Sequence, residues 1–368
     1  MIILYEYFFQ PLPTSIGYYY VYGTYLITIL GFYFGYTLKL KLPEYKFINH
    51  QEMLYTRKLR MLSVVFFISA WIIYMPILIE FKDFLLNPRE IYIRTRSGYG
   101  LTFFLSTTMI YISLVLTLFS FKNKFYLSIF FILLILFGYL HGSKGMIVMS
   151  TILLGLFIVY VKKVKISLSR LFVIVAFFSF FLISAFLFTS VGLDSLLEVI
   201  KMMSAYSDYT RNSIDLINNF DSMFQEPFWG QLTFESNFWS RVPRLLFEDK
   251  PRAFGEFRLS EAMFPEWFAQ NVGDASFGIM GIPFADFSYL GIHYIFLWSL
   301  LTGVIIKYLI NILKHTANVG IFILLCFFAG YGFIATGAGW MIFEHLFLAF
   351  MVNKLINTKF VYKREGII

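Results

Sequence analysis

The chain has 368 residues, of which 59% are hydrophobic and only 14% are charged. Soluble globular proteins are nearer half apolar and a quarter charged, so this composition excludes a soluble enzyme, a disordered chain and a fibrous protein. The net charge of +8 is typical of a membrane protein whose basic loops orient it in the bilayer, and no nucleic-acid partner is expected. The single cysteine, Cys326, excludes a disulfide framework and a zinc site built from cysteines.

A helix needs about 20 apolar residues to cross a bilayer, and nine segments of this chain are candidates. They are residues 17–38, 61–79, 101–121, 125–140, 145–161, 171–191, 289–306, 319–335 and 340–356. The first eight carry no charged residue, whereas Glu344 and His345 interrupt the ninth. The last two are separated at Thr-Gly-Ala-Gly, residues 336–339. The expected fold class is therefore an all-α polytopic membrane protein with about nine transmembrane helices. No cleaved signal peptide is expected, because the N-terminal stretch has no basic region and no cleavage site.

Basic residues predict the orientation, because cytoplasmic loops carry an excess of Lys and Arg. With nine spans, one set of loops holds 18 of these residues and the other holds 12, of which seven lie in one long loop. The first set is therefore predicted to be cytoplasmic. The N-terminus faces the periplasm and the C-terminus the cytoplasm in this prediction.

Three regions follow from this reading: a membrane bundle at 1–191, a large periplasmic loop at 192–282, and a second part of the bundle at 283–368. Apolar residues at helical spacing in 194–220 predict one or two amphipathic helices, which could lie along the outer membrane surface. The rest of the loop is rich in Gly, Pro and Trp. Its indole rings would anchor the loop at the lipid headgroups or stack on sugars.

The densest charge cluster of the chain lies in this loop, with five cations and four carboxylates between Glu235 and Arg258. Guanidinium groups match phosphate oxygens in pairs, so such a cluster could hold a pyrophosphate. A carboxylate beside it could act as a base. The alternative is a solvated loop with weak surface ion pairs.

Other residues predicted on the periplasmic side each have two possible interpretations. Arg94 and Arg96, just before the third span, are either interface anchors or ligands. The turn His141-Gly-Ser-Lys144-Gly could bind an oxyanion or simply be a tight helical hairpin. Glu344 and His345 lie inside a span, where ionisable groups are functional candidates or buried structural pairs. Asp286 and His293, at the outer end of the seventh span, carry the same ambiguity.

The layout as a whole resembles the Wzy-type O-antigen or oligosaccharide repeat-unit polymerases of the bacterial inner membrane. The resemblance rests on many Phe-, Tyr- and Ile-rich spans around one large periplasmic loop. Its sharpest local parts are Arg-Val-Pro-Arg at 241–244 running into Asp-Lys-Pro at 249–251, Gly-Ile-Pro at 281–283, and the His-Gly-Ser-Lys-Gly turn.

This resemblance implies a glycosyltransferase of lipopolysaccharide or other polysaccharide biosynthesis, multi-pass in the inner membrane. Its substrates would be undecaprenyl-pyrophosphate-linked oligosaccharide repeat units in the lipid bilayer, and a chain-length regulator is a candidate partner. No cofactor or metal is expected. The candidate bases are Glu235, Glu248, Asp249 and Glu256. The candidate ligands of substrate or pyrophosphate are Arg241, Arg244, Lys250, Arg252, Arg94, Arg96, His141, Lys144, Glu344 and His345.

Two alternatives remain at this stage. An O-antigen ligase-type enzyme would share the layout and the lipid-linked donor but would use another acceptor. A lipid-linked oligosaccharide transporter is expected to have about a dozen or more spans, related halves and charges inside several spans. The absence of a P-loop, a His-Glu-x-x-His motif and a Gly-x-Ser-x-Gly motif removes support from ATP-driven transport and from zinc or serine hydrolysis.

Overall fold

The computed structural model is helical throughout the part of the chain that it describes, with no strand among those residues. The described residues are 6–9, 11–12, 14–39, 52–95, 99–121, 123–191, 195–205, 208–239, 242, 247, 249–269, 275–316, 318–330 and 338–357. The all-helical part of the fold prediction is confirmed for these residues.

Each of the nine predicted apolar segments coincides with a helix. These helices are α2 (Ile16–Thr37), α3 (Glu52–Glu80), α5 (Gly100–Ser120), α6 (Lys124–Leu140), α7 (Lys144–Leu156) with the π-helical turn η2 (Phe157–Val161), α8 (Leu168–Val191), α15 (Gly291–Thr316), α16 (Val319–Gly330) and α17 (Ala338–Asn357). Within the described residues, four helical stretches are long and apolar enough to cross a membrane: Arg57–Glu80, Gly100–Ser120, Leu168–Phe188 and Gly281–His315. Three further apolar helices are shorter: Phe125–Leu140, Gly145–Val161 and Val319–Ala329. The predicted end of the eighth span, 331–335, lies outside the described residues.

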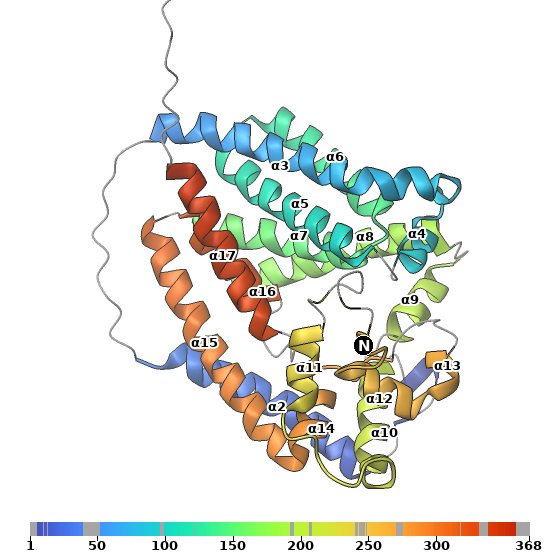
Figure 1. The fold of residues 1–368 in the computed structure, drawn as a ribbon. Helices are drawn as coiled ribbons and strands as arrows, with labels where there is room; N and C mark the ends of the chain where they lie inside the picture. The colour runs from blue at the N-terminus through green and yellow to red at the C-terminus, as the bar shows by residue number, and fades with distance from the viewer. Residues whose placement is uncertain are drawn as a thin grey trace, which may run out of the picture.

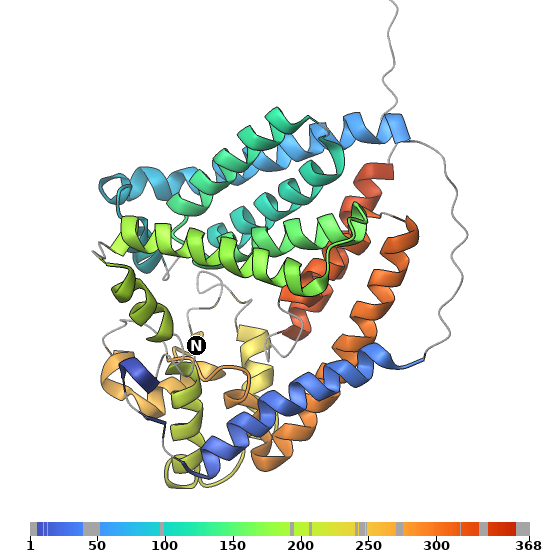
Figure 2. The ribbon, with the colours of Figure 1, turned by 180° about the vertical axis from the view of Figure 1, so that it is seen from behind.

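The long helices form two groups (Figure 1). Helix α3 lies along α5, with α6, α7 and α8 beside them, and α2 lies along α15. The view from behind shows the same two groups, with α16 and α17 between them (Figure 2). One large core of apolar side chains joins the first group to α15, α16 and α17. Helix α8 exposes aromatic and aliphatic side chains along its length, a surface that a bilayer would cover.

Glycines explain the close pairing of α2 with α15. A Cβ added at Gly35 would overlap the carbonyl group of Leu300, and one added at Gly31 would lie 2.8 Å from the carbonyl oxygen of Phe296. On the opposite helix, a Cβ at Gly303 would meet the backbone of α2 at Phe32. Small residues at such positions let two helix backbones approach closely, as is common in membrane proteins.

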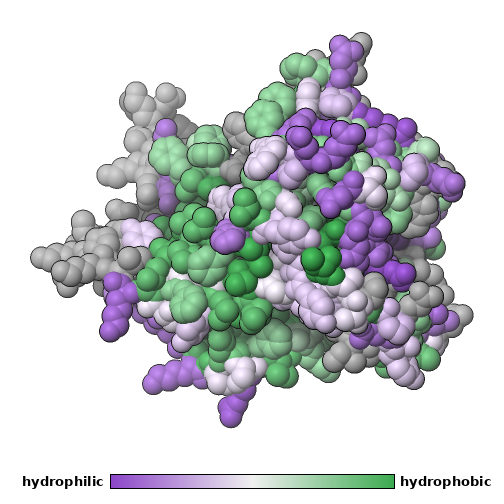
Figure 3. All heavy atoms as spheres, turned by 90° about the horizontal axis from the view of Figure 1, so that it is seen from below, coloured by the Kyte–Doolittle hydropathy of each residue, from purple (hydrophilic) through white to green (hydrophobic). Residues whose placement is uncertain are grey.

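The short helices gather on one side of the molecule, at the right in Figure 1. They are α4 (Pro88–Arg94), preceded by η1 (Lys82–Phe84), α9 (Leu196–Ala205), α10 (Asp208–Met223), α11 (Gln231–Trp239), α12 (Glu256–Met263), α13 (Pro265–Ala269) and α14 (Gly281–Phe287), which η3 (Ser288–Leu290) links to α15. Seen from below, hydrophilic side chains gather on the side of these helices and hydrophobic ones on the other (Figure 3).

Where the sequence predicts one or two amphipathic helices within 194–220, the structure has two, α9 and α10. The placement of α10 on the membrane surface is wrong, because its apolar face is buried inside the protein. Ile214, Leu216, Ile217 and Phe220 pack with α2 and α14 in a second core. An amphipathic pattern shows that a face needs covering but not whether lipid or protein covers it.

Candidate active site

Helix α11, which begins the predicted charge cluster, is tied to α14 by a buried carboxylate. Asp286, near the end of α14, is completely buried. Its Oδ1 accepts the backbone N–H of Leu232 at 2.9 Å, and its Oδ2 accepts the N–H and the hydroxyl of Thr233 at 2.9 and 2.6 Å. A carboxylate is stabilised here because the first N–H groups of a helix have no partner within the helix.

The backbone reinforces the same junction. The N–H groups of Phe228 and Trp229 donate to the carbonyl oxygens of Ala285 and Asp286, at 3.0 and 2.8 Å. Five hydrogen bonds therefore join α11 and the turn before it to the end of α14.

Glu235, a candidate base, lies on the next turn of α11 and has both oxygens engaged. Its Oε2 accepts the backbone N–H of Gly255 at 2.9 Å. Its Oε1 accepts from the Arg258 guanidinium at 2.9 Å and from the Gln231 amide at 2.7 Å. The Glu235 side chain is only 14% exposed. These bonds hold the start of α12 against α11.

Gly255 makes this approach possible. Its φ of +55° with ψ of −125° is a conformation that side-chain-bearing residues rarely adopt. An added Cβ would overlap Ser236 Oγ and would lie 3.1 Å from the carbonyl oxygen of Leu232.

Glu256, another candidate base, ties α12 to the segment that leads into α14. Its Oε1 accepts the N–H of Phe277 at 2.7 Å and the hydroxyl of Ser276 at 3.1 Å. The carbonyl oxygen of Phe277 in turn accepts the N–H of Gly281, the first residue of α14, at 3.2 Å. The three carboxylates Asp286, Glu235 and Glu256 thus link α11, α12 and α14 in a closed circuit, which we call the carboxylate frame.

The remaining charges of the cluster lie on the chain between α11 and α12. Lys250 donates to the carbonyl oxygen of Val242 at 2.9 Å and lies 4.8 Å from the centre of the Phe254 ring. The Arg252 guanidinium donates to the carbonyl oxygens of Phe268 and Ala269 and lies over the Phe268 ring. Asp249 is exposed at a turn. Arg241, Arg244 and Glu248 lie outside the described residues.

A second set of predicted residues surrounds the turn between α6 and α7. His141 is 2% exposed, and its Nε2 lies 3.5 Å from Ser106 Oγ and 3.3 Å from Thr107 Oγ1 of α5. The ring stacks on Tyr74 with 4.8 Å between centroids. Burial lowers the pKa of His141, so the imidazole is neutral near pH 7 and acts as a hydrogen-bonding group rather than a cation.

The glycine of this turn supports the tight-hairpin reading. Gly142 has a φ of +65°, and an added Cβ would meet the backbone of Pro88 at the start of α4. Arg94, at the other end of α4, is exposed, pairs with Glu90 at 3.3 Å and lies over the Phe84 ring. Lys144 begins α7, but its side chain is not described, and Arg96 lies outside the described residues.

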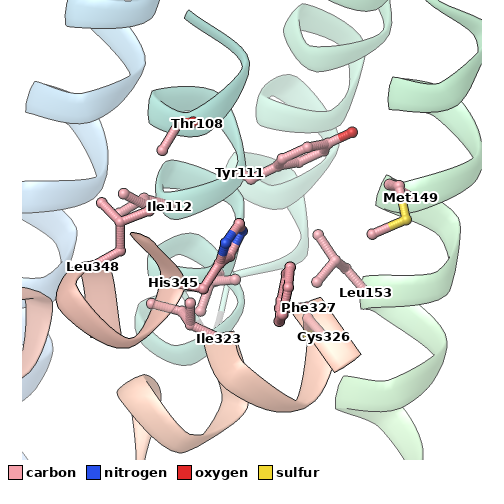
Figure 4. Close-up of a pocket in the computed structure, with 11 residues that line it drawn as sticks. Thr108, Tyr111, Ile112, Met149, Leu153, Ile323, Cys326, Phe327, His345 and Leu348 are labelled. Carbon is pink, nitrogen blue, oxygen red and sulfur yellow. The ribbon is translucent and has the colours of Figure 1, made fainter. Parts of the chain in front are cut away.

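The third set lies on α17, whose neighbour is α11 (Figure 1). His345 stacks on Phe327 of α16 with 4.1 Å between centroids. It projects into a cavity of about 60 Å³ between α5, α7, α16 and α17, together with the polar side chains of Thr108 and Tyr111 (Figure 4). Glu344 is half-buried next to it in the chain.

The predicted site residues that the structure describes therefore lie in three places. One set is on α11 to α14, the second is around the turn at His141 beside α4, and the third is on α17, next to α11. Sequence reasoning missed the role of Asp286 as a cap of α11 and the pairing of Arg258 with Glu235. The available signal was a lone carboxylate in the apolar stretch 281–287. The partners of Asp286 lie more than fifty residues away, so the sequence did not indicate what it binds.

Comparison with known proteins extends over nearly the whole chain. No protein-family model matches it, and no solved structure matches it. Over 356 residues, the chain is 32% identical to the O-antigen polymerase of Salmonella typhimurium, covering 95% of this chain and 83% of that protein. The O-antigen polymerase of Salmonella typhi matches with the same identity and coverage. The chain therefore belongs to the O-antigen polymerase family.

Proposed function

We propose that this protein polymerises undecaprenyl-pyrophosphate-linked oligosaccharide repeat units at the periplasmic face of the inner membrane. The observation that carries the proposal is the 32% identity to O-antigen polymerases over 95% of the chain. The gathering of ionic side chains on short helices at one end of an apolar helical bundle supports it, because a lipid-linked substrate needs a polar site within reach of the bilayer.

In this reaction, a hydroxyl of the acceptor sugar attacks the anomeric carbon of the donor chain. The bond to the lipid pyrophosphate breaks and the pyrophosphate leaves with its electron pair. Cations must offset the charge on the leaving group, and a base must take the hydroxyl proton. We assign the first role to Arg241, Arg244, Lys250 and Arg252, with Arg94, Arg96 and Lys144 as further candidates. We assign the second role to Asp249 or Glu248, in the same loop.

The topology belongs to the same proposal. Nine helices cross the membrane, residues 192–282 lie in the periplasm, and the C-terminus lies in the cytoplasm. The start of α2, the end of α3, and helices α4 and α9 to α13 lie toward one end of the molecule (Figure 1), which is consistent with that assignment. Glu344 and His345 then lie about two turns inside the outer end of α17.

A ligase-type enzyme is the second candidate, since it would use the same donor. Deletion of the gene distinguishes the two when the surface glycans are separated on a gel. A polymerase deletion leaves single repeat units attached to the surface. A ligase deletion removes all surface attachment, and an unchanged ladder would contradict both functions.

Single substitutions test the proposed site. We expect Arg241→Ala and Arg244→Ala to abolish long glycan chains at a normal protein level. Arg211→Ala on α10 is a matched control, because Arg211 lies on another helix and its pair with Asp215, at 3.7 Å, is partly exposed. Normal chain-length ladders from the Arg241→Ala/Arg244→Ala double variant would remove this loop from the mechanism.

A further inference from the structure

Two carboxylates of the candidate site, Glu235 of the cluster and Asp286 of α14, contact protein groups on either side of the loop rather than face outward. We propose that Glu235 is a positioning residue, which together with Asp286 and Glu256 fixes the two helices that flank the loop 240–254, α11 and α12, relative to α14. This inference rests on the proposed function, because it assumes that the cations of this loop bind the lipid pyrophosphate. It assigns roles to Asp286, Arg258 and Gly255 that the mechanism above does not use.

The contacts of Glu235 carry the argument. A general base needs an oxygen within hydrogen-bonding reach of the proton that it removes. Both oxygens of Glu235 instead accept from protein donors at 2.7 to 2.9 Å, and the side chain is 14% exposed. The residue that donates to Oε2, Gly255, is 20 positions further along the chain. Glu235 therefore closes the loop at its base.

Loop closure matters because the loop carries the cations. A flexible segment that has to be ordered during the reaction costs free energy, whereas groups that are held in place beforehand stabilise the transition state without that cost. Arg258 adds an ion pair to this closure, because its guanidinium lies 2.9 Å from Glu235 Oε1. Gly255 donates its N–H to Glu235 Oε2 with a φ of +55°, a backbone conformation that residues with a side chain rarely adopt.

Asp286 and Glu256 connect this closed loop to the membrane helices. Asp286 caps α11 from the end of α14, and η3 leads from α14 directly into α15. Glu256 holds α12 to Phe277, just before α14. The helix on each side of the loop is thus hydrogen-bonded to α14 or to the segment just before it. Through these contacts, the frame holds α12, the helix that follows Lys250 and Arg252, next to α14, which leads into the apolar bundle.

A double-mutant cycle tests this role. The variants are Glu235→Gln, Arg258→Met and the double variant, assayed in detergent with lipid-linked repeat units extracted from the host strain that lacks the polymerase gene. Each single variant is expected to lower kcat/KM about tenfold, the equivalent of one hydrogen bond between charged groups. The double variant is expected to be no worse than either single variant, because both remove the same contact.

Two further readouts separate positioning from catalysis. A positioning residue leaves the acid limb of the pH–rate profile in place in Glu235→Gln, and Arg258→Lys recovers most of the loss because it keeps the cation. Glu261→Gln is the matched control, since Glu261 is an exposed carboxylate on α12, the helix that carries Arg258. Thermal unfolding of every variant shows whether the protein is folded in the assay.

The opposite results are equally distinct. Removal of a general base costs about 100-fold to 10,000-fold, so a loss of that size in Glu235→Gln, with the acid limb gone and Arg258→Met close to wild type, would make Glu235 the base. Wild-type rates in both single variants would overturn the positioning role. If Arg241→Ala/Arg244→Ala made normal ladders while the cycle behaved as expected, the proposed role of the loop would fail and the frame would remain.

Discussion

Substitution of Gly255 by alanine perturbs the carboxylate frame at the hydrogen bond between Gly255 N–H and Glu235. The φ of +55° and ψ of −125° cost a side-chain-bearing residue about 1–3 kcal/mol. The new Cβ would also lie 3.0 Å from Ser236 Cβ, closer than ordinary van der Waals contact, which adds about 1 kcal/mol of overpacking. The total, about 2–4 kcal/mol, matches or exceeds the roughly 1.5–3 kcal/mol of a hydrogen bond to a charged group. We therefore expect Gly255→Ala to break the bond from Gly255 N–H to Glu235.

The assay combines the thermal unfolding midpoint in detergent with the glycan chain lengths of a complemented deletion strain. Gly255→Ala is expected to lower both, with a loss of activity similar to that of Glu235→Gln. Gly23→Ala is the control, because a Cβ at this helical position meets no atom within 4 Å. Adding Ser236→Ala to Gly255→Ala removes the overlap with Ser236 Oγ but not the backbone strain, so little recovery is expected. An unchanged midpoint and unchanged chain lengths in Gly255→Ala would refute this reasoning.

The other predictions concern stability and topology. Asp286→Ala removes the acceptor of one buried and two partly buried donors and is expected to cost about 3 kcal/mol, seen as a lower unfolding midpoint. Asp215→Ala, which removes a partly exposed ion pair, should cost at most about 1 kcal/mol, and equal effects would contradict the buried cap. Gly35→Ala is expected to push α2 away from α15 at a cost of about 1–3 kcal/mol, again measured by thermal unfolding, and a wild-type midpoint would argue against the pairing. Alkaline phosphatase fused after Glu226 is expected to be active, because this enzyme works only outside the cytoplasm; a silent fusion would overturn the topology.

The long helices could be predicted from the sequence because each is a local property of the chain. A run of about twenty uncharged apolar residues forms a helix wherever it lies. The bounds of α2 and α5 differ from the predicted segments by a single residue at each end. The helical spacing of apolar residues in 194–220, which is also a local property, predicted one or two amphipathic helices where α9 and α10 lie.

The packing of these helices could not be predicted in this way. The apolar face of α10 is compatible with lipid or protein, and only its neighbours α2 and α14 decide between them. Gly31 and Gly35 have the Gly-x-x-x-Gly spacing of closely packed membrane helices, but that spacing does not indicate that the partner is α15 or that Gly303 lies opposite. Pairings between distant segments depend on the whole fold.

The candidate site shows the same division. Charge density in the sequence indicated the cluster from Glu235 to Arg258, and three of its residues, Glu235, Glu256 and Arg258, meet protein partners within the frame. The sequence could not separate carboxylates that hold backbone N–H groups from carboxylates that face outward. Asp286 had the clearest local signal, a charge among apolar residues, but its partners on α11 are brought to it only by the fold.

The proposed function requires that this chain alone polymerises lipid-linked repeat units. The direct measurement uses the purified protein in detergent with lipid-linked repeat units from the deletion strain, without any nucleotide. We predict a ladder of lipid-linked chains whose length grows with time. Repeat units that remain single under these conditions, with the protein folded, would contradict the proposed function.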